Sequence, residues 1–265
     1  MGPLNSERAF LTLDTHRLFC YSSLLMNNPK NEMADNLCYS PDFKYTHDNP
    51  YHDKLAVFDG FVLRDEEAEK NRGTWKKDIF KNDLPIEVEI GTGYGEFMHE
   101  YCQKNPNVNF IGLDHRFKRS FQLAKKLDKL EHKNFKYMRA RGERLEFMFG
   151  DSEVQSVFYF FPDPWPKNRH NKKRLFQKPF LDAAYKVLAP GGSLFVKTDH
   201  DGYFEWMKSF FKDDDRFEIT LETTNLREEH PEHFLAQFTT KFEKIFLSQG
   251  TKIKSVVLKS KKPQG

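Results

Sequence analysis

The sequence contains few cysteines and no long hydrophobic run. Its three cysteines, Cys20, Cys38 and Cys102, are widely spaced among 265 residues, and none belongs to the C-x-x-C pair that is typical of structural metal sites. The apolar patch from Leu18 to Met26 is interrupted by two serines and is too short to span a bilayer. We therefore expect a cytoplasmic protein with reduced thiols and no bound metal.

An excess of charge of one sign is also absent. The 42 Lys and Arg residues nearly balance 39 Asp and Glu residues, which leaves a formal net charge of +3. Affinity for a polyanion must therefore come from local clusters of positive charge. The length suits one large domain or one domain with an appendage, and we expect a partly ordered N-terminal extension over residues 1–81 and a catalytic domain over residues 82–265. Trp75 and Phe80 are expected to pack against the core.

From residue 85 onward, strand patterns alternate with helix patterns. In the first strand, Ile86, Val88 and Ile90 alternate with Glu87 and Glu89. Further strands are expected near residues 108–113, 135–138, 157–161, 194–196, 217–221 and 253–258, with helices between most of them. This alternation predicts an α/β fold of right-handed βαβ units in a doubly wound, mostly parallel sheet.

A glycine-rich loop follows the first strand. It reads Gly91, Thr92, Gly93, Tyr94 and Gly95. Glycines lack a Cβ atom and let a ligand approach the backbone, so the loop predicts a nucleotide-like cofactor. A nicotinamide-binding loop would need a further glycine where this chain has Glu96. The alternative is a tight strand-to-helix turn without a ligand.

Two carboxylates are expected at neighbouring strand ends beside this loop. Asp114 ends the second strand, where the hydroxyls of a ribose can donate to it, and together with the loop it indicates an adenosyl group. Glu89 lies near the end of the first strand and could accept from a methionine ammonium, directly or through water.

The loop after the fourth strand reads Phe-Pro-Asp-Pro-Trp-Pro-Lys over residues 161–167. Open α/β sheets bind ligands at this edge. Asp163, Trp165 and Lys167 offer an acceptor, a flat ring and a cation, a set suited to a planar base with several polar edges. The alternative is a rigid turn in which Asp163 caps a helix and Trp165 fills a gap.

A dense basic segment follows at once. It consists of Arg169, His170, Asn171, Lys172, Lys173 and Arg174. Basic runs are usually solvated surface, but beside a predicted base pocket this run indicates contact with RNA phosphates.

Together these residues resemble the bacterial tRNA (guanine-N7) methyltransferases, over about residues 75–258. The most specific similarity is the stretch of residues 160–174. Lys197-Thr198-Asp199 and the segment Thr240-Lys241-Phe242-Glu243 are also similar to substrate-binding motifs of that family.

The resemblance implies a seven-stranded Rossmann-like fold, with S-adenosylmethionine as methyl donor, S-adenosylhomocysteine as product, and tRNA as partner of a monomer or homodimer. It implies that Asp163 is the catalytic-site acid and that Lys167 and Asp199 contact substrate. Thr240, Lys241, Phe242 and Glu243 would close over a guanine in the variable loop, with Asp163 and Glu243 accepting from its N–H groups. Arg141 and Gly142 stand where the family usually has Asp or Asn beside a small residue, and their backbone would contact the adenine.

Several other interpretations remain open. Asp199 could cap the helix expected near Asp201, and Phe242 with Ile245 could be ordinary amphipathic packing. The acceptor could be an exocyclic amine or a protein side chain, or the fold could be a noncatalytic RNA-binding scaffold. A nicotinamide dehydrogenase ranks last because of Glu96.

Overall fold

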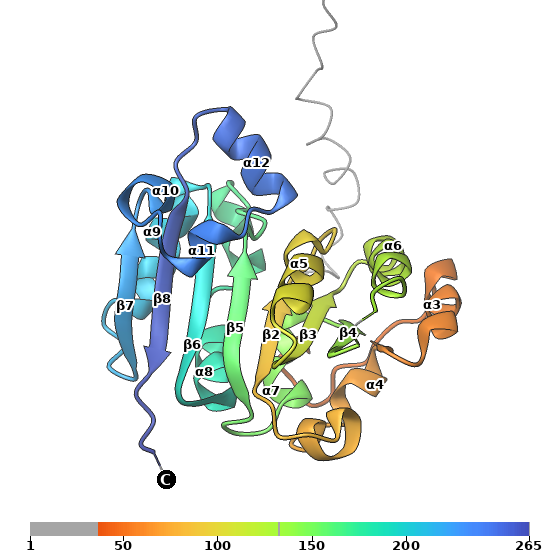
Figure 1. Ribbon diagram of the computed structural model, residues 1–265. Helices are drawn as coiled ribbons and strands as arrows, with labels where there is room; N and C mark the ends of the chain where they lie inside the picture. The colour runs from red at the N-terminus through yellow and green to blue at the C-terminus, as the bar shows by residue number, and fades with distance from the viewer. Residues whose placement is uncertain (1–36, 132, 265) are drawn as a thin grey trace, which may run out of the picture.

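The computed structural model describes residues 37–131 and 133–264, so Cys20 and the apolar patch near Leu18 lie outside the described residues. Its centre is an eight-stranded sheet in the order β1-β4-β3-β2-β5-β6-β8-β7 (Figure 1). The strands are β1 (Val62–Arg64), β2 (Ile86–Ile90), β3 (Asn109–Asp114), β4 (Phe135–Arg139), β5 (Val154–Phe160), β6 (Leu188–Thr198), β7 (Phe217–Thr223) and β8 (Lys254–Ser260). Only β8 runs antiparallel to its neighbours, which confirms the predicted doubly wound, mostly parallel sheet.

Helices cover both faces of this sheet. The α-helices are α3 (Pro50–Leu55), α4 (Glu66–Glu69), α5 (Glu96–Lys104), α6 (Phe117–Leu127), α7 (Leu145–Met148), α8 (Lys178–Val187), α9 (Asp201–Phe211), α10 (Leu226–Glu229), α11 (Phe234–Gln237) and α12 (Lys241–Ser248). Shorter or wider helical turns are η1 (Ala56–Phe58), η2 (Trp75–Phe80), η3 (Gly142–Arg144) and η4 (Asn168–Lys173). No helix among the described residues is long and apolar enough to cross a membrane.

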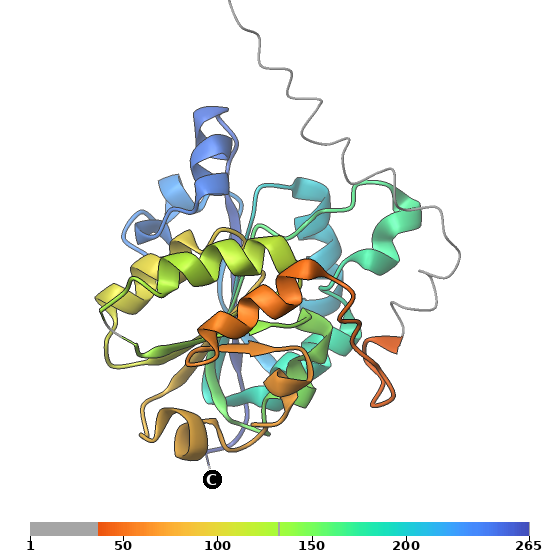
Figure 2. The ribbon, with the colours of Figure 1, turned by 90° about the vertical axis from the view of Figure 1, so that its right-hand side faces the viewer.

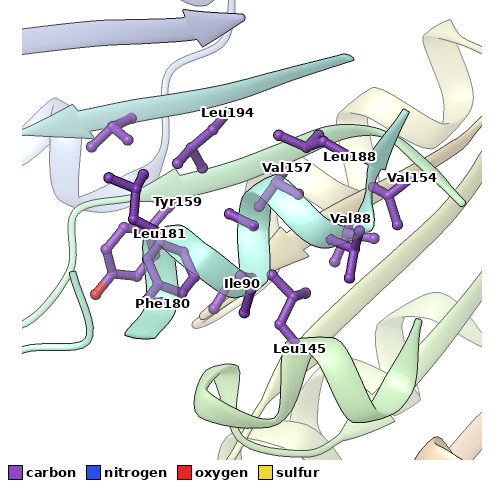
Figure 3. Packing of buried hydrophobic residues seen from close by; sticks show 14 of the residues in the cluster. Val88, Ile90, Leu145, Val154, Val157, Tyr159, Phe180, Leu181, Leu188 and Leu194 are labelled. Carbon is purple, nitrogen blue, oxygen red and sulfur yellow. The ribbon is translucent and has the colours of Figure 1, made fainter. Parts of the chain in front are cut away.

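The core is divided by the sheet into two apolar clusters. One lies against α7, α8 and α9, and Figure 3 shows part of it, with Val88, Val157 and Leu194 from three strands and Phe180 from α8. The other lies against α5 and α6, with α3 packed alongside α6 (Figure 2). The sheet is therefore covered on both sides, and its functional groups must gather at strand ends.

Strand β2 differs from an ordinary amphipathic strand because all five of its residues are buried. The Ile side faces the α7–α8 cluster as expected. The opposite side carries Glu87 and Glu89, which are 8% and 3% exposed. Glu87 accepts a 2.9 Å hydrogen bond from the Ser156 hydroxyl on β5. The alternating pattern therefore belongs to a strand that is covered on both faces, and its carboxylates are enclosed beside the glycine-rich loop.

Strand β6 is longer than its apolar pattern predicted. It begins at Leu188 and includes the Pro190-Gly191-Gly192 stretch, whose residue types are typical of a turn. The pairing between β5 and β6 shifts register between Val154 and Ser156. A Cβ added at Gly192 would lie 2.8 Å from the backbone oxygen of Gln155, so glycine lets the two strands approach at this irregularity.

The N-terminal segment adds structure that the sequence did not reveal. Strand β1 pairs with β4 and extends a seven-stranded sheet by one strand at its edge. Trp75 is completely buried, and its indole N–H donates a 2.8 Å hydrogen bond to the backbone oxygen of Met148. Phe80 packs against the same cluster. The predicted packing of Trp75 and Phe80 is confirmed, whereas the division at residue 81 stays a prediction.

Candidate active site

The glycine-rich loop joins β2 to α5 at the carboxyl end of the sheet. Gly91, Gly93 and Gly95 have φ angles of 77°, 58° and 73°, which side-chain-bearing residues rarely adopt. A Cβ at Gly95 would lie 2.1 Å from a methyl of Leu123 on α6, whereas a Cβ at Gly91 would meet nothing within 4 Å. Gly95 therefore allows α6 to pack closely against the loop. The space above the Gly91 backbone is open, as access for a ligand requires.

Asp114 ends β3 beside this loop and is 5% exposed. Its Oδ2 accepts a 3.2 Å hydrogen bond from the Gly93 amide, and its Oδ1 accepts a 2.8 Å bond from the Arg116 amide. Each carboxylate oxygen has a second lone pair. The backbone thus fixes Asp114 at the strand end where the sequence predicted a ribose contact.

Glu89 is buried on β2, which pairs with the strand that ends at Asp114, and one of its carboxylate oxygens is unsatisfied. Its Oε2 has no hydrogen-bond partner. Burial, together with the charges of Glu96 and Asp114, raises the pKa of Glu89 to about 8. A buried acceptor without a donor is costly unless a ligand supplies one, so this carboxylate fits the ammonium of an S-adenosylmethionine-like cofactor, with Asp114 suited to its ribose.

The predicted substrate loop leaves β5 through two unusual backbone conformations. Phe161 and Trp165 have φ angles of 49° and 45°, both in the left-handed region. For bulky residues such angles are rare and store strain of order 1–3 kcal/mol each. Because such strain concentrates at ligand clamps and active sites, the finding argues against a plain rigid turn.

Asp163 lies between these two residues, and its side chain is 61% exposed. Its Oδ2 accepts a 2.7 Å hydrogen bond from the guanidinium of Arg116, which follows β3. The carboxylate caps no helix. Instead it is held by Arg116, whose amide also binds Asp114. The end of β3 and the loop after β5 are therefore directly connected.

Arg174, the last residue of the basic segment, is buried rather than solvated, at 6% exposure. Its guanidinium donates to the backbone oxygens of Pro164 and Trp165, at 2.8 and 3.3 Å. It also lies 5.1 Å from the ring centroids of Tyr203 and Trp206. Arg174 therefore fixes the substrate loop, a role different from the phosphate contact predicted from the sequence.

The remaining basic residues surround Trp165 on the surface. The Lys173 ammonium lies 5.0 Å above the Trp165 ring, and the His170 ring packs edge-on against it with centroids 5.7 Å apart. Arg169 donates a 3.3 Å hydrogen bond to His170, and Lys172 is exposed. Lys167 is exposed at the start of this segment, and the Asn171 side-chain oxygen has no hydrogen-bond partner.

Helix α12 lies above the carboxyl end of the sheet (Figure 1). Phe242 lies near the glycine loop, with its ring centroid 6.4 Å from that of Tyr94 and one ring atom 4.0 Å from where a Gly93 Cβ would lie. Phe246 lies 5.9 Å from the Phe161 ring. The helix therefore contacts both predicted loops. Phe242 and Ile245 remain 37% and 42% exposed, so they are not ordinary core packing.

A buried ion pair anchors the start of α12. Glu243 and Lys197 are both fully buried, with 2.6 Å between Oε2 and Nζ. Glu243 Oε1 accepts a 2.6 Å bond from Arg227, and the Glu243 amide donates to the Thr240 hydroxyl, which caps the helix. Lys241 lies 5.0 Å above the Tyr94 ring. Both Glu243 oxygens thus have cationic partners, an arrangement suited to holding the helix.

The remaining predicted residues lie at two other strand ends. Asp199 follows β6 and does not cap α9, because His200 accepts the hydrogen bond from the Tyr203 amide. Burial raises the pKa of Asp199. Arg141 and Gly142 follow β4. A Cβ at Gly142 would lie 2.8 Å from a methyl of Ile90, so this glycine lets the β4 loop approach β2.

Sequence reasoning missed two charged residues of this site and named a third, Lys197, only as part of a motif. Arg116 and Arg227 lie in segments whose pattern gave no signal, because each acts on a partner distant in sequence. Lys197 did give a signal, since it is a charged residue in the apolar strand β6. Its ammonium also donates to the backbone oxygens of Leu235 and Phe238, so it joins β6 to the segment before α12.

The chain was compared with known proteins. A family model described as "Putative methyltransferase" matches residues 83–256. A bifunctional glycosyltransferase/methyltransferase of Fusobacterium nucleatum is 35% identical over 87% of this chain, which spans only 35% of that protein. The tRNA (guanine-N(7)-)-methyltransferases of a Geobacillus species and of Streptococcus thermophilus are 33% and 35% identical, covering 76% and 75% of this chain and 88% and 90% of theirs.

Proposed function

The chain belongs to this methyltransferase family, and we propose that it transfers a methyl group from S-adenosylmethionine to N7 of a guanine in tRNA. The glycine loop, Glu89 and Asp114 bind the donor, and Arg141 and Gly142 contact its adenine. The substrate loop with Lys167, Asp199 and α12 receives the base, and the basic segment apart from the buried Arg174 binds RNA phosphates. We place the guanine in the variable loop.

One observation carries the proposal: Asp163 is held at 2.7 Å by Arg116, directly beside the strand end that carries Asp114. This connection supports the proposal, because a carboxylate beside the predicted donor pocket could accept hydrogen bonds from a base. Strained residues on both sides of Asp163 fix the loop. A noncatalytic RNA-binding scaffold would not need such an arrangement, nor would it need the open glycine loop.

The residues have a modest chemical task. When bound, S-adenosylmethionine would supply an electrophilic methyl group, and guanine N7 carries a lone pair that is available without prior loss of a proton. No strong general base is therefore required. Asp163 accepts from guanine N–H groups and orients N7 in line with the methyl, so the rate gain comes from positioning. Phe242 and Tyr94 exclude water above the glycine loop.

Glu243 takes a different part in this proposal from the one suggested by its sequence motif. Because its two oxygens are paired with Lys197 and Arg227, it holds α12 over the loops. Thr240 caps the same helix, while Lys241 and Phe242 face the Tyr94 ring.

The test is incubation of the purified chain with bulk tRNA and S-adenosylmethionine carrying a labelled methyl group, followed by mass spectrometry of the nucleosides. Label in 7-methylguanosine, mapped to the variable loop, supports the proposal. Label in another nucleoside or in protein would assign a different acceptor. Binding of tRNA without any transfer, together with no heat of S-adenosylmethionine binding, would favour a noncatalytic scaffold.

A further inference from the structure

A second cluster of chemically capable side chains lies outside this site, in the N-terminal segment. His47 precedes α3, His52 lies within it, and Asp65 stands between β1 and α4. The distance to Asp65 Oδ2 is 3.3 Å from His52 Nε2 and 3.7 Å from His47 Nε2. All three ligand atoms lie within 4.8 Å of one another, and no other such group occurs within residues 37–131 and 133–264.

Asp65 is the unusual member of the cluster. Its side chain is 0% exposed, and its Oδ2, the oxygen facing both histidines, has no hydrogen-bond partner. The other oxygen is taken by the Arg139 guanidinium. The backbone of Asp65 has a φ of 51°, in the left-handed region that non-glycine residues avoid. A strained residue whose buried carboxylate oxygen accepts no hydrogen bond indicates a cationic ligand.

The spacing of the three atoms suits a tetrahedral metal. With ligand bonds near 2.0–2.1 Å, the edges of a tetrahedral Zn²⁺ site are about 3.4 Å long. The two measured distances of 3.3 and 3.7 Å are close to that edge. Imidazole nitrogens with a carboxylate favour Zn²⁺ over Mg²⁺ or Ca²⁺, which prefer sites made of oxygen alone.

Neighbouring groups complete such a site. His52 Nδ1 lies 3.3 Å from Asp53 Oδ1, which leaves Nε2 for the metal. Glu66 Oε2 lies 2.9 Å from His47 Nε2, so α4 borders the cluster, although Glu66 is not among the residues whose ligand atoms lie within 4.8 Å of one another. The Arg139 guanidinium on Asp65 Oδ1 supplies the outer hydrogen bond that usually orients a ligating carboxylate.

We propose that His47, His52 and Asp65 form a Zn²⁺ site in the N-terminal segment, with water as the fourth ligand. The ion joins α3 to the β1–α4 turn, and the contact of Arg139 with Asp65 connects that turn to the end of β4. There Arg139 pairs in register with Asp114, so the site supports the strand end next to the donor pocket. The expectation of no metal considered only cysteines and did not consider this combination of histidine and aspartate.

The test is titration of the full-length, chelator-treated protein with Zn²⁺ by calorimetry, and with Co²⁺ by visible spectroscopy. We expect one ion per chain and the intense visible bands of tetrahedral Co²⁺. His47→Ala and His52→Ala should each weaken Zn²⁺ binding by ~100-fold, while the control His99→Ala leaves it unchanged. Zn²⁺ should raise the Tm of the parent and of the control, but not that of either histidine variant.

Two results would overturn the proposal. One is substoichiometric binding by the parent protein, or Co²⁺ spectra without tetrahedral bands. This measurement uses the parent protein alone and does not depend on the folding of a variant. The other is stoichiometric Zn²⁺ binding that survives both histidine substitutions, which would place the ion elsewhere. Neither measurement depends on methyl transfer, so the metal site can fail or hold independently of the proposed function.

Discussion

The guanidinium of Arg116 and the carboxylate of Asp163 lie 2.7 Å apart, although 46 residues separate them in the chain. Arg116 follows β3, and Asp163 follows β5. The pair is partly exposed, at 39% and 61%, so it contributes little to the free energy of unfolding. Its significance is geometric, because it aims the carboxylate of the substrate loop toward the strand end that holds Asp114.

Replacement of Asp163 by Asn should lower the rate of methyl transfer to tRNA by about 10–100-fold. This is the rate equivalent of a hydrogen bond to a charged group, worth about 1.5–3 kcal/mol. Single-turnover rates at saturating S-adenosylmethionine measure the effect. Because the side chain is exposed, calorimetric cofactor affinity and Tm should stay those of the parent. A full rate in Asp163→Asn would remove this residue from the mechanism.

The second prediction concerns pH and Glu89, whose pKa burial raises to about 8. In the unfolded chain the same group releases its proton near pH 4.5. Between these values the folded state holds a proton that the unfolded state has lost, so the free energy of unfolding falls as pH rises. Urea unfolding without ligand should show this decline from about pH 5 to pH 8, and Glu89→Gln should flatten it.

The same residue makes cofactor binding pH-dependent. Only the ionised Glu89 attracts an ammonium, so S-adenosylmethionine affinity should rise by up to about tenfold per pH unit from pH 6 and level off near pH 8. Calorimetry in buffers of different ionisation enthalpy should detect proton release at pH 7. If Glu89→Gln bound the cofactor with unchanged affinity and unchanged pH profile, Glu89 would not contact it.

The double variant Lys172→Ala/Lys173→Ala should weaken tRNA binding and reduce the slope of log affinity against log salt by about 2, because each lost phosphate contact removes about 1. Lys76→Ala/Lys77→Ala is a charge-matched control on η2, which precedes β2 and so lies at the opposite end of the sheet. Fluorescence anisotropy at several salt concentrations measures both. Equal slopes in the two variants would remove the basic segment from the interface.

Lys197→Met should lower the free energy of unfolding by about 3 kcal/mol, since it leaves Glu243 buried with one cationic partner fewer. The variant Lys197→Met/Glu243→Leu should recover part of this loss, giving a coupling energy above about 1 kcal/mol in a double-mutant cycle. Urea unfolding of the parent, the two single variants and the double variant provides the four free energies of unfolding. Faster proteolysis within α12 should accompany Lys197→Met. Strict additivity would show that the pair does not anchor the helix.

The sequence predicted most of the sheet because its strands are short apolar runs bounded by glycine and proline, and the two predicted loops followed from strand ends. It did not predict β1, since three residues define no period. It could not distinguish the role of Arg174 from that of the lysines beside it. Arg174 differs from them because it is buried against Pro164 and Trp165, which only the fold reveals. Nor could it assign Glu243 a cationic partner, since Lys197 and Arg227 meet it only in three dimensions.

The pairing of β1 with β4 has a consequence for self-association. Without β1, residues 137–139 of β4 would present unpaired amides and carbonyls along the sheet margin, and such margins recruit strands from other molecules. Strand β1 occupies those groups, and it is only three residues long before the chain turns away at Asp65. A chain beginning at residue 82 would therefore expose a template for edge-to-edge aggregation even with its catalytic loops intact.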